Sequence, residues 1–432
     1  MKLLIKNGRI IDPISNTDEV KDLMIEDDKI VAVKKNIEEK VDKIIDAKNC
    51  WVVPGLIDIH VHLREPGFED KETISSGSQS AAKGGFTTIC CMPNTNPVID
   101  NKDVVKYIQE KANKEALVNI LPIGAITKGQ EGRELAAIEE MMEAGICGIS
   151  EDGKAVMKAT LMEEALEVAS KLKLPVFSHC EDHDLSNDGV MNEGDRCREL
   201  GLKGISPDAE EIIAARDIFL AQKLDVKLHL CHISTQGTVE ILRQSKKRDK
   251  RITAEVCPHH FTLTEEAVTP NNTNTKMNPP LRTYKDIEAI KEALRDGTID
   301  IIATDHAPHH EREKNLSYVE APFGIVGLET AVPLVITELV DKGILTPIQM
   351  IEKMSTKPAA LLGLDKGELK IGKIADVTII NPYEVYDIDI NKFASKGKNS
   401  PFHGKTVKGK VNYTIVAGKL IVENGELLVD KQ

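Results

Sequence analysis

Short apolar runs alternate with longer amphipathic stretches along most of the sequence. Runs of about four to eight apolar residues are typical of buried strands, whereas an apolar residue every three or four positions is typical of a helix. Eight such runs, separated by stretches with helical spacing, lie between residues 56 and 304. They are Leu56–Leu63, Phe86–Met92, Leu117–Ala125, Ile146–Ser150, Pro175–Cys180, Val226–Ile233, Arg251–Cys257 and Ile299–Thr304.

The segment 160–173 illustrates the stretches between the runs. Leu161, Ala165, Ala169 and Leu172 recur at helical spacing, and charged residues fill other positions, so we interpret the apolar stripe as core packing. Strands that alternate with helices in this way indicate parallel βαβ units. Eight of them predict an α/β fold, a closed (β/α)8 TIM-type barrel.

Both ends of the chain lack this alternation and favour short strands with turns. The expected strands are Leu3–Ile5, Arg9–Ile11 and Asp22–Ile25 near the start, and Gly367–Leu369, Ala375–Ile380, Val411–Val416 and Lys419–Val422 near the end. We therefore predict that residues 56–357 form the barrel. Residues 1–55 and 358–432 would pair as one small composite β-sandwich domain.

Composition and charge narrow the class of protein. The 432 residues carry a formal net charge of −13 without a basic stripe, which argues against nucleic-acid binding. Charges interrupt the first residues, and no apolar run reaches the roughly 20 residues that span a bilayer. The eight Cys form no CxxC pair. We expect reduced thiols, a cytoplasmic protein and no membrane partner.

Polar residues gather at the ends of the predicted strands. On the first run, Asp58, His60, His62 and Arg64 share one face, which we expect to be the barrel interior, with Asp58 orienting a histidine. Enzymes of this fold carry their chemistry at the carboxyl ends of the strands. Equivalent positions elsewhere hold Asp152, His179, His232 and Asp305. Four His and two Asp are therefore expected at one mouth.

Neutral imidazoles and carboxylates suit zinc best among the common metals. One catalytic zinc takes about three protein ligands, so six candidates favour two metals about 3.5–4 Å apart with a shared carboxylate. A lone histidine on a strand is more often a core residue than a ligand. The joint occurrence of ligand types at five strand ends favours the metal centre.

Nearby residues have a simpler interpretation. Strand alternation predicts that Cys180, Cys231 and His229 pack away from the mouth. We interpret His259 and His260, after the seventh run, as mainly structural, with an outer contact to the site as the alternative.

Several segments resemble a known family. Pro54–His62 (PGLIDIHVH) resembles the opening signature of the amidohydrolase superfamily, and Leu63–Gly67 (LREPG) resembles dihydroorotases. Further segments that fit are Gly84–Thr88 through Met92–Thr95, Asn278–Arg282, Ala303–His309 and Pro322–Gly324. Residues 367–377 resemble the β-sandwich segment that closes many amidohydrolases. The resemblance covers essentially the whole chain.

The resemblance implies two zinc ions, one held by His60, His62 and Asp305 and the other by His179 and His232. In many relatives a carboxylated Lys on the fourth strand bridges the metals. Residues 149–153 (ISEDG) contain no Lys. A bacterial class I type of dihydroorotase uses an Asp there, and Asp152 matches that position, whereas Glu151 does not.

The implied activity is the reversible hydrolysis of the cyclic amide of dihydroorotate to N-carbamoyl-aspartate, in de novo pyrimidine biosynthesis. Asp305 is the implied catalytic residue, which accepts a proton from water and passes it to the leaving nitrogen. The implied substrate contacts are His62, Arg64, Asn94, Asn278, His309, Phe323 and Gly324. The guanidinium of Arg64 can hold a carboxylate with two parallel hydrogen bonds. Residues 310–321 would be a loop that closes over the substrate, or an ordinary surface loop.

Three alternatives stay open at this point. An allantoinase or a hydantoinase would use a carboxylated Lys and would not need Arg64, Asn94 and His309 for a substrate carboxylate. A non-catalytic partner of aspartate carbamoyltransferase would have lost its ligands, whereas all six positions are filled here. We expect a homodimer, and association with aspartate carbamoyltransferase stays open.

Overall fold

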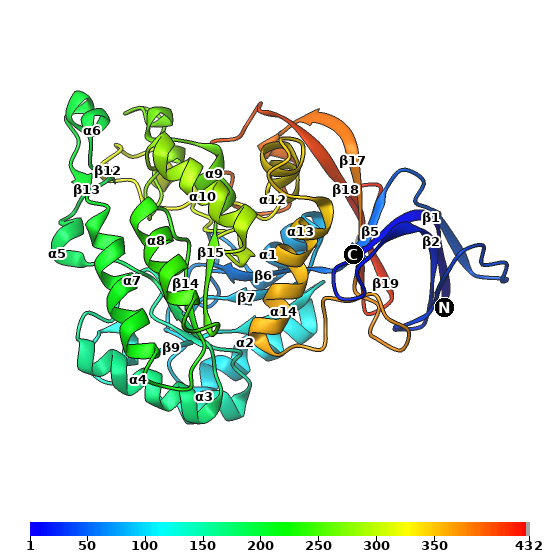
Figure 1. Ribbon diagram of the computed structural model, residues 1–432, viewed down its shortest axis with the longest axis horizontal. Helices are drawn as coiled ribbons and strands as arrows, with labels where there is room; N and C mark the ends of the chain where they lie inside the picture. Colours follow the sequence, from blue (N-terminus) through cyan, green and yellow to red (C-terminus); the bar gives the residue numbers. More distant parts are fainter. Residues whose placement is uncertain (429–432) are drawn as a thin grey trace.

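The computed structural model describes residues 1–428 and has two parts (Figure 1). Parallel strands surrounded by helices form the larger part. A mixed nine-stranded sheet beside them contains both blue N-terminal and red C-terminal strands. No helix among these residues has the length and apolar character needed to cross a membrane.

The parallel strands form two sheets, in the order β6-β7-β8 and β9-β10-β11-β14-β15-β16. Their bounds are β6 (Leu56–Val61), β7 (Phe86–Cys91), β8 (Asn119–Pro122), β9 (Gly124–Ala125), β10 (Ile149–Ser150), β11 (Val176–Ser178), β14 (Leu228–Leu230), β15 (Ile252–Val256) and β16 (Ile301–Ile302). All eight predicted runs contain a strand, with β8 and β9 in the third. Val61 forms a parallel bridge to His306, and His306 O accepts the N–H of His62 at 2.8 Å. The chain beyond the last strand therefore lies against the first.

Helices cover the outside of these strands. The longer ones are α1 (Ile74–Lys83), α2 (Lys102–Glu115), α3 (Ile138–Ala144), α4 (Ala159–Leu172), α7 (Asp208–Ala221), α8 (Gln236–Lys246) and α10 (Tyr284–Asp296). Shorter ones are α5 (His183–Ser186), α6 (Asp195–Leu200), α9 (Pro258–Thr262), α11 (Glu311–Lys314), α12 (Ala331–Val335), α13 (Pro347–Ile351) and α14 (Lys357–Leu362). Two short strands, β12 (Met191–Asn192) and β13 (Gly204–Ile205), pair with each other.

Local signals fix the ends of the helices. The Thr283 hydroxyl caps α10 by accepting the N–H of Asp286, whose carboxylate in turn accepts the N–H of Thr283. Gly297 ends the helix in a left-handed conformation at φ 81°, which glycine adopts without a steric cost. The predicted stripe of α4 is buried at Leu161, Ala165 and Ala169.

The interior of the barrel part is apolar. Ile57, Ile59, Phe177, Cys231 and Ile301, which come from strands all around it, share one buried cluster. Side chains of opposite parity face the helices, among them Leu56, Val176, Leu230 and Ile302. Leu and Ile side chains buried on both faces stabilise the strands by about 1.5–3 kcal/mol each.

Ile57 and Ile59 are in this cluster, and the first strand, β6, pairs with an irregular register. Between Asp58 and Val61, β6 advances three residues while β7 advances two, from Ile89 to Cys91. This β-bulge breaks the strict side-chain alternation and redirects the residues that follow, as bulges beside active sites commonly do.

The second part is one connected sheet made from both ends of the chain. Its order is β20-β19-β18-β17-β5-β1-β2-β3, with β4 beside β1. The bounds are β1 (Lys2–Asp12), β2 (Thr17–Glu26), β3 (Lys29–Lys34), β4 (Lys43–Asp46), β5 (Trp51–Pro54), β17 (Val377–Asp387), β18 (Thr406–Val416), β19 (Lys419–Glu423) and β20 (Glu426–Leu427). The antiparallel pairing of β5 with β17 joins the two ends, for example Val52 opposite Ile379.

The C-terminal segment differs in detail from its expected course. The expected strand Gly367–Leu369 is wrong, because these residues form no strand. The expected boundary between residues 357 and 358 falls inside α14, whose Ala359 and Leu361 share the interior cluster of the barrel strands. Residues 429–432 of the expected domain lie outside the described residues.

Candidate metal centre

The six candidate ligands all lie at the carboxyl ends of parallel strands. His60 is in β6 and His62 directly follows it. The other four come just after β10, β11, β14 and β16, and they are Asp152, His179, His232 and Asp305. Five of them are at most 5% exposed, and the side chain of Asp305 is 12% exposed. The structure therefore brings all six together at one mouth.

Asp152 lies at the middle of this group. Its Oδ1 is 3.1 Å from Nε2 of His60, and its Oδ2 is 3.5 Å from Nε2 of His62. Nδ1 of His179 and Nε2 of His232 each lie 3.8 Å from Oδ1. Asp152 thus shares one group of close ligand atoms with His60 and His62 and another with His179 and His232. A carboxylate common to two ligand groups is what a bridged pair of metals needs.

Asp305 lies beside the first histidine pair. Its Oδ1 is 3.0 Å from Nε2 of His62 and 3.6 Å from Nε2 of His60. His60, His232 and Asp305 also offer ligand atoms within 4.8 Å of one another. Asp305 therefore lies close enough to both histidine pairs to act on a group bound between them.

The unpartnered atoms at the centre fit a divalent cation. Nε2 of His60 and Oδ1 of Asp152 are buried and form no hydrogen bond in the described residues. His60 Nε2 and Asp152 Oδ1 are close, but without hydrogen-bond geometry. Buried polar atoms without partners are costly, and a metal ion would satisfy them.

The charges around His60 also favour a cation. Burial opposes a charged His60, but Asp152, Glu255 and Asp305 outweigh it and hold the pKa of the imidazole well above its usual value. Burial opposes a charged Asp152 too, yet His60 and the other histidines keep the pKa of its carboxyl well below the usual range. The centre therefore stabilises positive charge.

Outer contacts fix which ring nitrogen faces the centre in three of the four histidines. His60 Nδ1 lies 2.6 Å from Glu255, His62 Nδ1 lies 2.9 Å from Asn94 Oδ1, and His179 Nε2 lies 3.1 Å from Glu181. Partners of this kind hold a ligand's tautomer and ring orientation. Asp58 acts differently from expectation: its carboxylate accepts the backbone N–H of His60 and of Thr304, not an imidazole.

Sequence reasoning missed Glu255 and Glu181. Glu255 is fully buried, and burial opposes its charge, but His60 and His229 lower the pKa of its carboxyl far below the usual range. A single acid inside an apolar strand run was the available signal, since a buried carboxylate needs a partner. The partner, His60, is 195 residues away.

The interpretation of His229 and Cys231 as outward-facing is wrong. His229 Nε2 contacts Glu255 at 3.1 Å, and its ring meets Phe177 of the interior cluster. Cys231 is in that cluster, and its sulfur lies within 4.8 Å of ligand atoms of His60 and Glu255. Cys180 packs toward the helices, as predicted.

Three site residues have an uncommon backbone conformation. Arg64, His232 and Asp305 have φ values of 62°, 31° and 48°. Side chains other than glycine rarely adopt this left-handed region, and the cost of about 1–3 kcal/mol per residue is typical of functional sites. At each of these three residues the left-handed conformation changes the direction of the backbone just after a strand.

Arg64 and His309 lie side by side. Arg64 donates from Nε to the Pro308 carbonyl at 3.1 Å, and one of its terminal nitrogens lies 3.4 Å from Nε2 of His309. His309 Nε2 donates to the Phe323 carbonyl at 2.8 Å. Burial lowers the pKa of both side chains, and Arg64 further lowers that of His309. His309 is thus a neutral donor next to a fixed cation.

The remaining candidates contact the same centre from its rim. Asn94 Nδ2 faces Asp152 at 3.5 Å, and Asn278 Nδ2 donates to Glu181 at 2.8 Å. Gly324 has φ 121°, and a Cβ there would lie 2.7 Å from Cβ of Ala307, so only glycine fits. The segment 310–321 is not simply a loop, because it begins with α11.

His259 and His260 are buried, and among residues 1–428 no carboxylate lies within ion-pair distance of either ring. Nε2 of His260 donates to the Pro279 carbonyl at 2.9 Å. Burial lowers the pKa of His259 to about 4, and the neighbouring histidines lower it further while Asp305 opposes them. Both rings are therefore neutral near pH 7, in agreement with a structural role.

Comparison with known proteins agrees with this geometry. The dihydro-orotase-like family model matches residues 50–238. A dihydroorotase of Acetivibrio thermocellus is 53% identical over 99% of this chain and 100% of its own, and one of Pelotomaculum thermopropionicum is 52% identical over 98% and 99%. The solved L-hydantoinase of Arthrobacter aurescens superposes with a TM-score of 0.89 at 25% identity, covering 99% of this chain and 97% of that one. This chain belongs to the dihydroorotase family.

Proposed function

We propose that this cyclic amidohydrolase reversibly hydrolyses dihydroorotate to N-carbamoyl-aspartate with two zinc ions. The observation that carries the proposal is the placement of Asp152 between two histidine pairs, next to a fixed Arg64. Relatives named dihydroorotase, 53% and 52% identical over nearly the whole chain, support the substrate. Two solved hydantoinase structures share the fold at 25% identity.

The ligands divide into two sets around Asp152. His60, His62 and Asp305 would hold one zinc, His179 and His232 the other, and Asp152 would bridge both, as in a bacterial class I enzyme. Zinc bound in this way lowers the pKa of water and polarises a carbonyl. Side chains of the protein would transfer the proton and bind the substrate.

Asp305 is the proposed general base and acid. Its carboxylate faces both histidine pairs and retains a negative charge: burial raises its pKa, but His60 and His62 outweigh burial and lower it. It accepts a proton from the attacking water and delivers that proton to the leaving ring nitrogen. A carboxylate held by the left-handed backbone at Asp305 needs little reorientation between these two transfers.

The substrate carboxylate would bind to Arg64, helped by Asn94 and His309. A guanidinium offers two parallel donors in the plane of a carboxylate, and the bond of Arg64 to Pro308 fixes that plane. The ring amides would meet Asn278, the backbone of Phe323 and Gly324, and the edge of His62. We also propose that the parallel strands close into one (β/α)8 barrel, which the bridge between Val61 and His306 supports.

An assay of ring opening tests the function. Purified protein with its zinc content measured should hydrolyse dihydroorotate and, at acid pH, cyclise N-carbamoyl-aspartate. Hydantoin and allantoin serve as matched neutral cyclic amides. Faster turnover of either neutral substrate, or an absence of dihydroorotate hydrolysis by zinc-loaded protein, would overturn the proposal.

A further inference from the structure

A cavity of about 660 Å³ lies beside the proposed substrate site. His309 and Asn399 form the wall between them. Asn399 accepts the N–H of His309 at 3.1 Å and donates to the Gly324 carbonyl at 3.1 Å. The same two residues thus hold the proposed substrate contacts on one side and line the cavity on the other.

Three lysines line this cavity: Lys314, Lys396 and Lys398. Among residues 1–428 none of them has a carboxylate within ion-pair distance. Each donates to backbone carbonyls instead, Lys396 to that of Glu69 and Lys398 to that of Phe393 at 2.7 Å. No carboxylate among these residues therefore neutralises the charges of the three lysines.

Lys314 is the most constrained of the three. It is 6% exposed, and its Nζ donates to the carbonyls of Pro322 at 2.9 Å and Gly324 at 3.2 Å. Burial lowers its pKa to about 7, with Lys276 adding to the effect and Glu313 opposing it. A buried ammonium without a counter-ion is costly, and an anion in the cavity would relieve that cost.

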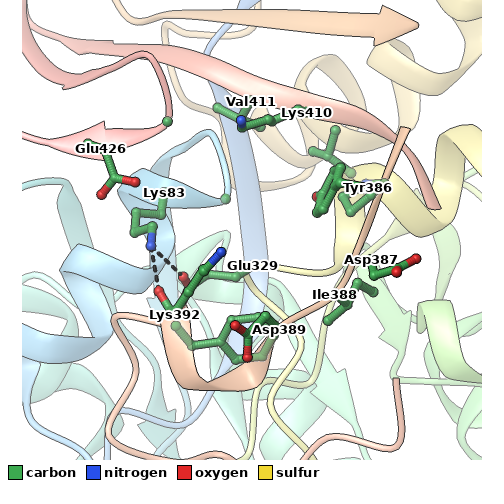
Figure 2. Close-up of a pocket in the computed structure, with 15 residues that line it drawn as sticks. Lys83, Glu329, Tyr386, Asp387, Ile388, Asp389, Lys392, Lys410, Val411 and Glu426 are labelled. Atoms are coloured by element: carbon green, nitrogen blue, oxygen red, sulfur yellow. Dashed lines mark hydrogen bonds and ion pairs between the residues drawn. The ribbon is translucent and has the colours of Figure 1, made fainter. Parts of the chain in front are cut away.

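A second cavity, between the barrel part and the large sheet, offers a comparison (Figure 2). There Lys83 pairs with Glu329 at 3.5 Å and also donates to the Lys392 carbonyl. Lys410 pairs with Glu384 at 2.7 Å. Lys83 and Lys410 thus have carboxylate partners, which the three lysines beside His309 lack, while Lys392 in the second cavity has no such partner among residues 1–428.

Two acidic residues also line the cavity beside His309. Asp70 is neutralised by Arg312 at 2.6 Å, whereas Glu311 is exposed and points to no described cation. The local balance is therefore positive, in a chain whose net charge is −13. A cationic cavity in an acidic protein concentrates small anions locally.

We propose that this cavity is an outer binding site for carboxylate ligands, next to the metal centre and separated from it by His309 and Asn399. The inference rests on the proposed function for the identity of the natural ligand, an amide-bearing mono- or dicarboxylate. It adds a second site, built from Lys314, Lys396 and Lys398, at which the anion is held before it reaches Arg64.

Kinetics at two ionic strengths test the site. The double variant Lys396→Gln, Lys398→Gln should lower kcat/KM for dihydroorotate about three- to tenfold at low salt, with kcat unchanged, because the cations act on capture. At about 0.5 M salt the difference should disappear through screening. Lys410→Gln, in the second cavity, is the matched control. A loss of kcat, a loss that persists at high salt, or no loss at all would overturn the proposal.

A binding experiment keeps the inference separate from the proposed activity. Succinate, a dicarboxylate that cannot react, is titrated by calorimetry into zinc-loaded Arg64→Met protein, which lacks the inner carboxylate partner. Binding should persist there and weaken at least tenfold when both lysines are also replaced. No succinate binding, binding unaffected by the lysines, or binding of inorganic phosphate alone would refute the outer site, whatever the dihydroorotase assay gives.

Discussion

Two buried groups of histidines lie near the same strand ends but have opposite charge preferences. In the first group, burial opposes a charged His179, yet Asp152 and Glu181 raise its pKa to about 10. In the second, burial lowers the pKa of His259 to about 4. Both imidazoles are at least 95% buried, so burial alone cannot account for the difference.

The neighbouring carboxylates account for it. Cys257, His259 and His260 also place three donor atoms within 4.8 Å, but no carboxylate joins them, and burial holds the pKa of the Cys257 thiol well above its usual value. A group of neutral donors does not need a cation, whereas Asp152 among the histidines does. Proximity of ligand types is therefore a weaker indicator of a metal centre than uncompensated negative charge.

The largest effect is expected from removing the carboxylate of Asp305 while keeping its shape. In Asp305→Asn the amide oxygen can still bind zinc but cannot accept a proton. Turnover should fall by roughly two to four orders of magnitude with zinc largely retained, and the acidic limb of the pH–rate profile should move or disappear. Steady-state kinetics with metal analysis on the same sample measure both. Zinc-replete protein with normal turnover and an unchanged profile would leave Asp305 as a ligand only.

Asp152→Ala should cost the centre one of its two proposed zinc ions. His179 and His232 alone make a poor two-ligand site, whereas His60, His62 and Asp305 still form a three-ligand site. Metal analysis after dialysis should give about one zinc per chain. Glu151→Ala, which removes a neighbouring buried carboxylate that binds Thr127 and has no proposed zinc contact, serves as the control. Retention of two zinc ions at near-normal turnover would show that Asp152 is not the bridge.

Glu255→Gln tests the outer carboxylate that supports the first histidine group. The amide keeps a hydrogen-bond acceptor for His60 but removes the negative charge, so zinc affinity should fall about 10- to 100-fold. Competition with a chelator measures the affinity. Thr253→Val is a matched control, because Thr253 is on the same strand as Glu255 and contacts His229 of β14, not a proposed ligand. An unchanged zinc affinity in Glu255→Gln would contradict this role.

Arg64→Lys should impair only substrates that carry a carboxylate. Lysine keeps the charge but cannot form two parallel hydrogen bonds, so kcat/KM for dihydroorotate should fall about 10- to 100-fold, equivalent to about 1.5–3 kcal/mol. A neutral cyclic amide should lose much less. Because a folding defect would affect both substrates alike, equal losses would refute the proposed contact.

The residues of the mouth could be predicted because strand ends of a parallel sheet meet at one edge. Six ligands from five strands follow from that rule and from their chemical types. The faces of individual side chains could not be predicted, since the bulge between Asp58 and Val61 breaks the alternation on which they depend. The prediction that His229 and Cys231 face outward failed for a related reason. It assumed that strand alternation continues to His232, but β14 ends at Leu230.

Contacts between segments that are distant in the sequence could not be predicted either. Nothing in the composition of residues 388–405 links them to the mouth, yet Asn399 holds both His309 and Gly324. The pairing of Glu255 with His60 depends in the same way on closure of the fold. Such residues carry no local signal because their partner is 75 or more residues away.

The smallest effect on activity is expected in the second histidine group, where the comparison makes a prediction about stability. His259 is neutral in the folded protein, with a pKa of about 4, but takes up a proton near its ordinary value of 6.5 when unfolded. Between these values the unfolded state binds more protons, so this histidine lowers the stability progressively as pH falls from 6.5 toward 4. At pH 5 the loss relative to pH 7 should be about 2 kcal/mol.

In His259→Gln that contribution should vanish, even if the substitution shifts the stability equally at both pH values. Urea unfolding of both proteins at pH 7 and pH 5 gives the two differences, and zinc loss at low pH affects both alike. Turnover at pH 7 should stay within about threefold, because the group holds no charge for the centre. If the variant keeps the full pH dependence, or loses its zinc, the second group is part of the metal centre and the contrast between the two groups fails.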